Sequence, residues 1–214
     1  MIGLSLPSGP LTVLCVGAHP DDVEIGCGGT VLRLAERGGV TLHVATLTGS
    51  EERRREGAAA AQAFHPGAVS HTWDFPDGRL PAHWDAVKDA LEGLARTVRP
   101  DVVLAPRTDD AHQDHRLLGT LVPTTWRDAL VLGYEIVKWD GDLGTATTYV
   151  PLDERVARRK VELLHAAYPS QHGHDWWDDE TFLGMMRVRG VECRARYAEA
   201  FVVRKATVDL GEGS

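Results

Sequence analysis

The sequence predicts an α/β fold, a Rossmann-like three-layer sandwich with helices on both faces of a mostly parallel sheet. The first observation is LTVLCVG at residues 11–17, a continuous apolar run typical of a strand covered on both faces. The second is the alternation of such runs with segments of helical spacing. The third is that polar loops follow two of these runs, as in sheets that bind ligands at the carboxyl ends of their strands.

The first half of the chain is expected to alternate strand and helix. A polar stretch, AHPDDVEIGCGG, leads to a helix over residues 30–37 that a glycine pair ends. A strand over 40–48 and an alanine-rich helix over 51–64 come next. The irregular segment WDFPDGRL carries turn residues and precedes an amphipathic helix over 84–98.

The second half continues this pattern. We expect strands over residues 101–106 and 131–139, helices over 153–167 and 181–188, and a last strand over 198–205. Residues 1–214 are expected to form a single domain with its core at about 11–204. The glycines at 26, 28 and 29 match no phosphate-loop motif and predict close helix packing.

Composition excludes several classes of function. With 31 acidic and 23 basic residues the net charge is −8, which disfavours nucleic acid as a partner. The three cysteines lack CxxC spacing and favour a reducing, cytoplasmic location. No signal peptide is evident, and no apolar run approaches the length that spans a membrane.

Two polar loops carry the residues suited to chemistry. They follow the strands at 11–17 and 101–106, and they contain His19, Asp21, Asp22, His112, Asp114 and His115. If these strands are parallel neighbours, both loops project from one sheet edge and their side chains converge. Clustered acids serve no structural purpose there and repel one another, which favours a metal site.

The residue types indicate a catalytic metal with an open position. Two histidines and one carboxylate are a ligand set that catalytic zinc uses to bind and acidify water. A turn can aim His19 and Asp22 at one point and leave Asp21 off the metal as a general base. Of His112 and His115, one can bind metal and the other can donate a proton, while Asp114 can orient a histidine.

AHPDD at residues 18–22 and HQDH at residues 112–115 resemble the paired motifs of the PIG-L/LmbE deacetylase family. REGAAAAQA, FPDGRL, KVELLHAAYPSQ and YAEAF also resemble family segments, in the same order. The resemblance implies zinc-dependent removal of an N-acetyl group from an N-acetylglucosamine-type amino sugar or glycoconjugate. Iron(II) is the alternative metal.

The resemblance also implies residue roles. His19, Asp22 and His115 would bind zinc, Asp21 would be the general base and His112 the electrophile and acid. Asp114 would hold His112 in its tautomer. Arg53, three residues before a glutamate, would grip substrate hydroxyls, and Asp77 would contact the sugar.

The chain departs from the family at one position, and other functions compete with deacetylation. Some family members have a tyrosine where this chain has Asp110. DAHQDH also resembles the HxHxDH motif of metallo-β-lactamase-like hydrolases, although their first histidine is again Asp110. A non-catalytic Rossmann-like ligand-binding domain is the non-enzymatic alternative, and a homo-oligomer is expected by resemblance.

Overall fold

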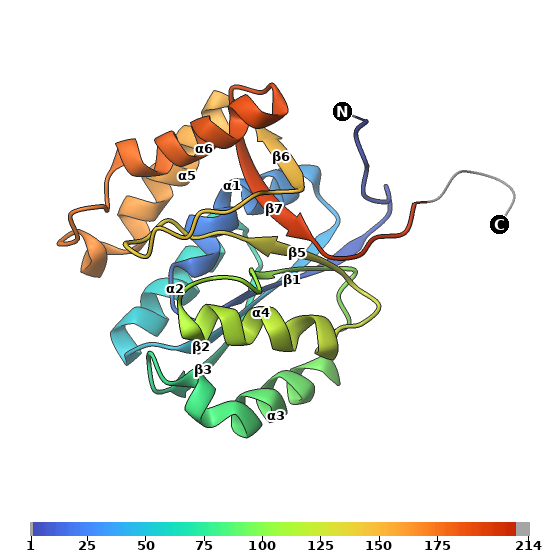
Figure 1. The fold of residues 1–214 in the computed structure, drawn as a ribbon, viewed down its shortest axis with the longest axis vertical. Coiled ribbons are helices and arrows are strands. Elements are labelled where there is room, and N and C mark those ends of the chain that lie inside the picture. The colour runs from blue at the N-terminus through green and yellow to red at the C-terminus, as the bar shows by residue number, and fades with distance from the viewer. Residues whose placement is uncertain (1, 209–214) are drawn as a thin grey trace, which may run out of the picture.

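A seven-stranded sheet forms the centre of the molecule (Figure 1). The computed structural model describes residues 2–208. Its strand order is β3-β2-β1-β4-β5-β7-β6. The strands are β1 (Leu11–Gly17), β2 (Val40–Thr48), β3 (Val69–Phe75), β4 (Val102–Pro106), β5 (Leu130–Tyr134), β6 (Thr148–Leu152) and β7 (Tyr197–Val203). The first five of these run parallel, and β7 is antiparallel to both of its neighbours. The expected mostly parallel sheet is confirmed.

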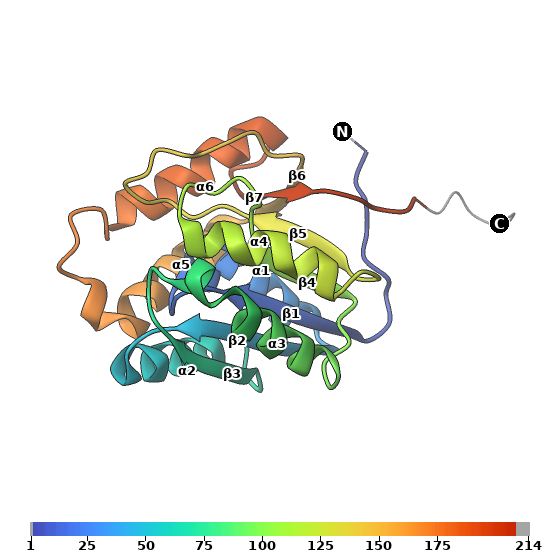
Figure 2. The same ribbon diagram turned by 60° about the horizontal axis from the view of Figure 1, so that its bottom comes forward.

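Helices cover both faces of the sheet (Figures 1 and 2). They are α1 (Asp22–Arg37), α2 (Glu51–Phe64), α3 (Trp84–Ala95), α4 (Gln113–Thr125), α5 (Glu154–Ala167) and α6 (Asp179–Cys193), with short 3-10 turns at Leu80–His83 and Pro169–Gln171. One core contains side chains of α1, α2, α5 and α6, and the other contains those of α3 and α4. The expected three-layer sandwich is therefore confirmed.

The central strand β1 explains why both loops of interest reach the same place. Val13 and Cys15 enter one core, whereas Leu14 and Val16 enter the other, so this strand is apolar on both faces. β1 pairs in parallel with β4, in the register Val13 to Val102. Both strands therefore end at the same edge of the sheet.

Helix α1 begins earlier than its glycine-rich sequence indicated. It starts at Asp22, eight residues before the expected position, and is kinked at Cys27. A Cβ at Gly28 would lie 2.7 Å from Phe64 of α2, and one at Gly29 would lie 2.5 Å from Leu152 of β6. These glycines permit close packing, as predicted, and that packing outweighs their low helix propensity.

Four other elements differ from the expectations. β3 and β6 are strands that the sequence did not reveal, because neither shows a continuous apolar run, and α4 begins within the polar loop that ends in HQDH. The helix expected at 181–188 extends over the whole of α6. Among the described residues, no helix is both apolar enough and long enough to cross a membrane.

A buried ion pair links α5 to the last strand, β7. Lys160 of α5 lies 2.7 Å from Glu199 of β7, and both side chains are 3% exposed. Glu199 also accepts hydrogen bonds from the backbone amides of Gly29 and Thr30, at 2.7 and 2.6 Å. Because both carboxylate oxygens of Glu199 have partners, its charge can stay buried. Its contacts with the Gly29 and Thr30 amides fix α1 against β7.

Candidate metal centre and active site

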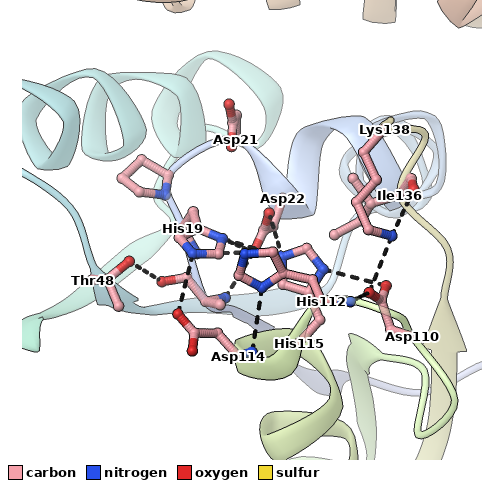
Figure 3. Close-up of polar contacts among 12 residues, drawn as sticks. His19, Asp21, Asp22, Thr48, Asp110, His112, Asp114, His115, Ile136 and Lys138 are labelled. Carbon is pink, nitrogen blue, oxygen red and sulfur yellow. Dashed lines mark hydrogen bonds and ion pairs between the residues drawn. The ribbon is translucent and has the colours of Figure 1, made fainter. Parts of the chain in front are cut away.

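The loop between β1 and α1 is folded tightly by its own backbone contacts. Oδ2 of Asp22 accepts hydrogen bonds from the amides of Ala18 and His19, both at 2.8 Å. Asp21 has a φ of 103°, in the left-handed region that side chains other than glycine rarely adopt. Its carboxylate consequently points away from the imidazole cluster, whereas that of Asp22 points into it (Figure 3).

The loop between β4 and α4 is organised around the first turn of that helix. His112 is the N-cap, and its Nδ1 accepts a hydrogen bond from the amide of Asp114 at 3.3 Å. Asp110 accepts the amide of His112 at 2.8 Å. These contacts bring Asp114 and His115 to the buried side of α4, with at most 3% of either residue exposed.

His19, Asp22 and His115 converge, as the sequence predicted (Figure 3). Nδ1 of His19 lies 3.1 Å from Nε2 of His115 and 3.4 Å from Oδ2 of Asp22. Nε2 of His115 lies 3.3 Å from Oδ1 of Asp22. His112 also offers a nitrogen within 4.8 Å of the other two imidazoles.

These separations suit a small metal ion. Ligand atoms about 2.0–2.1 Å from a tetrahedral zinc ion are about 3.3 Å from one another. Nδ1 of His19 and Nε2 of His115 lie 3.1 Å apart, and Asp22 places one carboxylate oxygen 3.3 Å from Nε2 of His115 and the other 3.4 Å from Nδ1 of His19. Two imidazole nitrogens and a carboxylate oxygen are also donors that zinc and iron(II) accept. The residues present therefore fit the metal that the sequence pattern implies.

The charges of the cluster favour binding of a cation. Burial by itself lowers the pKa of His19, but the carboxylate of Asp22 and hydrogen bonds to carboxylates raise it to about 12. Burial likewise lowers the pKa of His115, but the carboxylates of Asp22 and Asp110 together outweigh this effect and raise it to about 9. Asp22 has a pKa well below its usual range, because the two imidazoles outweigh the effect of its burial.

His112 differs from the other two imidazoles. It is about half-buried, and this burial, together with the charges of His115 and His19, lowers its pKa. It is therefore the imidazole most readily kept neutral. Since its Nδ1 accepts the Asp114 amide, the neutral ring carries its proton on Nε2.

The carboxylate of Asp21 is paired with Arg53 of α2. Nη2 of Arg53 donates to Oδ2 of Asp21 at 2.8 Å and also to the carbonyl oxygen of Pro20. Burial, opposed by the Arg53 charge, raises the pKa of Asp21 to about 8. Arg53, expected to contact substrate hydroxyls, thus lies beside the candidate base. Its role toward the substrate stays a prediction.

Asp114 has contacts other than the expected one. Its carboxylate accepts the amides of Gly78 and Leu80, at 2.8 and 3.0 Å, and lies 3.5 Å from Nε2 of His19. Only its backbone amide contacts His112. The first turn of α4 directs this side chain toward the loop after β3, and the expected role of Asp114 in holding the His112 tautomer stays a prediction.

That loop carries Asp77, the expected sugar contact. The Asp77 side chain is 72% exposed, and its Oδ1 lies 2.9 Å from Nε2 of His19. The close contact with the His19 imidazole lowers the pKa of Asp77. Asp77 thus lies at the edge of the cluster, accessible from solvent, and its contact with a sugar stays a prediction.

Sequence reasoning missed two residues of the site, Asp110 and Lys138. The carboxylate of Asp110 lies 3.2 Å from Nδ1 of His115 and 3.1 Å from Nζ of Lys138. Burial raises the pKa of Asp110, but the contacts with His115 and Lys138 outweigh it and lower the value to about 2. The position of Asp110, two residues before His112, could have identified it as part of the site. Lys138 follows a different strand, and no sequence spacing identifies it.

An aromatic cluster lies on the loops that follow β5 and α5. Trp139 is 70% exposed. Its ring packs edge-on against His174 and Trp176, and its Nε1 lies 3.2 Å from Oδ1 of Asp175. Both loops project from the same edge of the sheet as the starts of α1 and α4 (Figures 1 and 2). The sequence left the loop at residues 172–180 open between packing and substrate binding.

The fold and the site define a Rossmann-like α/β protein with a His/Asp metal centre at the carboxyl edge of its sheet. Residues 14–126 match the family described as PIG-L, GlcNAc-PI de-N-acetylase. The chain belongs to this family, and it is an N-deacetylase, a hydrolase of N-acetyl amide bonds. Deacetylases of the family are metal-dependent, and among residues 2–208 the cluster around His19 suits a metal.

Individual relatives agree with this assignment. The chain is 29% identical to the uncharacterized deacetylase YaiS of Escherichia coli, over 59% of this chain and 82% of that protein. It is 30% identical to diacetylchitobiose deacetylase of Thermococcus kodakarensis, over 51% of this chain and 46% of that relative. Neither the metallo-β-lactamase-like alternative nor the non-catalytic one is favoured by these matches.

The fold by itself does not specify the reaction. The solved structure of GalB, a 4-carboxy-2-hydroxymuconate hydratase from Pseudomonas putida, has a TM-score of 0.76 to this chain at 21% identity, covering 95% of this chain and all of GalB. That likeness concerns the fold alone. Chemistry must be argued from the side chains of the site.

Proposed function

We propose that this chain releases acetate from an N-acetylated amino sugar within a glycoside or another glycoconjugate. The observation that carries the proposal is the convergence of His19, Asp22 and His115 beside an additional acid and base. The two imidazole nitrogens lie 3.1 Å apart, and each lies within 3.4 Å of a carboxylate oxygen of Asp22. The family description and the diacetylchitobiose deacetylase relative support an amino sugar as substrate.

We assign the metal to His19 Nδ1, Asp22 Oδ1 and His115 Nε2, with zinc as the ion and iron(II) as the alternative. When bound, the ion would supply a Lewis acid that polarises the acetamide carbonyl and acidifies a water molecule. Oδ2 of Asp22 is held by two backbone amides, which leaves Oδ1 to face His115.

Asp21 is proposed as the general base. A carboxylate with a pKa raised toward neutrality accepts a proton from water more readily than an ordinary one, and burial has this effect on Asp21. As Asp21 takes the proton, the water oxygen forms a bond with the carbonyl carbon. Arg53 holds the Asp21 carboxylate in place through the 2.8 Å contact.

His112 is proposed as the electrophile and acid. Its neutral ring carries a proton on Nε2, which can stabilise negative charge developing on the carbonyl oxygen. As the carbon–nitrogen bond breaks, the sugar nitrogen receives the proton that Asp21 took from water. His112 acts as an acid by donating its Nε2 hydrogen bond, because full loss of that proton from a neutral ring would leave an imidazolate. Acetate and the free amine leave, with Asp21 ionised and His112 neutral as at the start.

The aromatic cluster supports a substrate larger than a single sugar. Trp139 is held by an edge-on contact with Trp176 and a contact with Asp175, while most of its surface stays exposed. A rigid exposed indole suits the apolar face of a pyranose ring or the apolar part of a conjugate.

We also propose a cytoplasmic location, supported by the three free cysteines. A homo-oligomer stays a prediction.

The decisive experiment pairs metal analysis with product detection. Metal content is measured by mass spectrometry, and acetate release is measured with N-acetylglucosamine, diacetylchitobiose and N-acetylglucosamine glycosides. We expect near-stoichiometric metal, and we expect Asp21→Ala to abolish acetate release while retaining the metal. His115→Ala is the matched variant that should lose the metal.

Each other outcome rejects a specific part of the proposal. Protein purified without bound metal, and unable to take up zinc, would reject the metal centre. Bound metal without acetate release from any sugar would reject the substrate class and leave other N-acetyl amides. Retained activity in Asp21→Ala would reject Asp21 as the base.

A further inference from the structure

The carboxylate of Asp110 lies behind the metal centre, on the far side of the His115 ring. Its side chain is 2% exposed, and its Oδ2 lies 3.2 Å from Nδ1 of His115. The other ring nitrogen of His115, Nε2, faces His19 and Asp22 at 3.1 and 3.3 Å. The imidazole therefore lies between a buried carboxylate and the metal ligands (Figure 3).

Lys138 holds this carboxylate from the loop after β5. Its Nζ lies 3.1 Å from Oδ1 of Asp110, and it contacts both carboxylate oxygens of Asp142 at 2.9 and 2.8 Å. Asp142 in turn accepts the amide of Ala111 at 2.8 Å. Lys138 and Asp142 thus clamp the residues that precede His112, although they lie outside both sequence motifs.

We propose that Asp110, held in place by Lys138, positions His115 for metal binding by fixing its tautomer and ring orientation. This inference rests on the metal centre of the proposed function. A neutral imidazole carries one N–H. The negative charge of a carboxylate 3.2 Å from Nδ1 favours the tautomer with the proton on that atom, although the N–H is not aligned for a hydrogen bond. The lone pair of Nε2 then faces the other ligands, whereas the opposite tautomer would place a hydrogen atom among them.

Lys138 has a separate part in this arrangement. A buried carboxylate without a positive partner is costly to keep ionised. The ammonium group of Lys138 compensates the charge of Asp110 and fixes the direction of its Oδ1, so that Oδ2 stays turned toward His115. In this proposal, Lys138 acts on His115 through Asp110.

The test compares two substitutions that remove the same charge from adjacent positions. Asp110→Asn removes the buried carboxylate and keeps an acceptor for the His112 amide. Asp109→Asn is the matched control, because the Asp109 side chain is 70% exposed and contacts Arg107. Zinc affinity of the full chain is measured by competition with a chromophoric chelator, alongside circular dichroism and thermal unfolding.

We expect Asp110→Asn to weaken zinc binding by about 10–100-fold and Asp109→Asn to change it by less than about 3-fold. A spectroscopic readout separates positioning from general stability. In zinc-loaded protein labelled with ¹⁵N-histidine, His115 should show a protonated Nδ1 in the wild type and a changed Nδ1 signal in Asp110→Asn. Equal zinc affinity of the two variants, with unchanged His115 signals, would overturn the inference.

Lys138→Met tests the second step and still probes Asp110 if Asp110→Asn does not fold. We expect a smaller loss of zinc affinity, about 3–10-fold, and no further loss when the substitution is added to Asp110→Asn. Multiplying losses would show that Lys138 acts independently and would overturn that step. A wild-type chain that binds no zinc would overturn the metal centre and this inference together, whereas zinc binding without acetate release would reject only the substrate.

Discussion

The guanidinium of Arg53 donates a hydrogen bond to Oδ2 of Asp21 at 2.8 Å and so links α2 to the loop that begins α1. Asp21 has a backbone φ of 103°, so its side chain points away from that of Asp22. Arg53 therefore places a positive charge directly beside the Asp21 carboxylate. The proposed base is therefore held in place and kept partly ionised by a residue first expected to bind substrate.

Arg53→Met should shift the pH dependence of the reaction. Arg53 is the largest influence opposing the burial that raises the pKa of Asp21, so its removal should raise that pKa further. Because the base acts in its deprotonated form, the acidic limb of kcat/KM should move to higher pH. A shift of about one pH unit corresponds to about tenfold lower activity on that limb.

The control for this prediction is Arg55→Met, because the Arg55 side chain is 77% exposed and pairs with Glu51 on the same helix. The measurement is the pH profile of kcat/KM and kcat for both variants. A higher KM with no shift of the acidic limb would instead indicate the substrate-binding role expected from the sequence.

Asp114→Asn should loosen the loop that carries Asp77. The Asp114 carboxylate accepts the amides of Gly78 and Leu80, and an amide side chain can replace only one of these acceptors. We expect about 1–3 kcal/mol lower stability and faster hydrogen exchange at these two amides. If exchange there is unchanged while the tautomer of His112 changes, Asp114 has the role first expected for it.

Glu24→Gln should stabilise the metal-free protein above about neutral pH. Burial raises the pKa of Glu24 to about 7, and its carboxylate accepts a hydrogen bond from Tyr168 at 2.8 Å. The folded state therefore binds more protons than the unfolded state between about pH 4.5 and 7, so the free energy of unfolding falls as pH rises through this window.

The advantage of Glu24→Gln over wild type should grow through that window, on the order of 1 kcal/mol per pH unit. Thermal unfolding in the presence of a chelator measures it, and the exposed Glu52→Gln is the control. A stability difference independent of pH would contradict the prediction.

Trp139→Ala should weaken the binding of extended substrates. With 70% of its surface exposed, Trp139 contributes little to the core, so unfolding temperature should change little. Loss of about 1 kcal/mol of stacking corresponds to a roughly fivefold higher KM for diacetylchitobiose. The KM for N-acetylglucosamine should be unchanged. Trp84→Ala, on the partly exposed start of α3, is the control. An equal rise in the KM of both sugars would contradict a contact between Trp139 and the second sugar alone.

Much of the fold was predictable because strong local patterns coincide with packing. β1 and β2 have the predicted bounds, and so does α2. β3 and β6 were missed because edge and antiparallel strands show no continuous apolar run. The start of α1 was missed because glycine disfavours helices locally, and its need to pack against Phe64 appears only in three dimensions.

The convergence of the proposed metal ligands was predictable from a single rule. His19 and Asp22 follow one parallel strand, His115 follows its neighbour, and parallel neighbours end at the same edge of a sheet. Side-chain direction was less predictable. The first turn of α4 directs the Asp114 carboxylate toward Gly78, and no sequence spacing reveals that direction.

The amino-acid sequence alone established the α/β class, the two motifs and the residue types that suit a metal, because these depend on short-range patterns. Tertiary structure alone established that Arg53 faces Asp21, that Asp110 lies behind His115, and that Lys138 reaches Asp110 from another loop. These contacts join segments that are distant in the chain. They arise from how the layers pack, and packing depends on the whole fold at once.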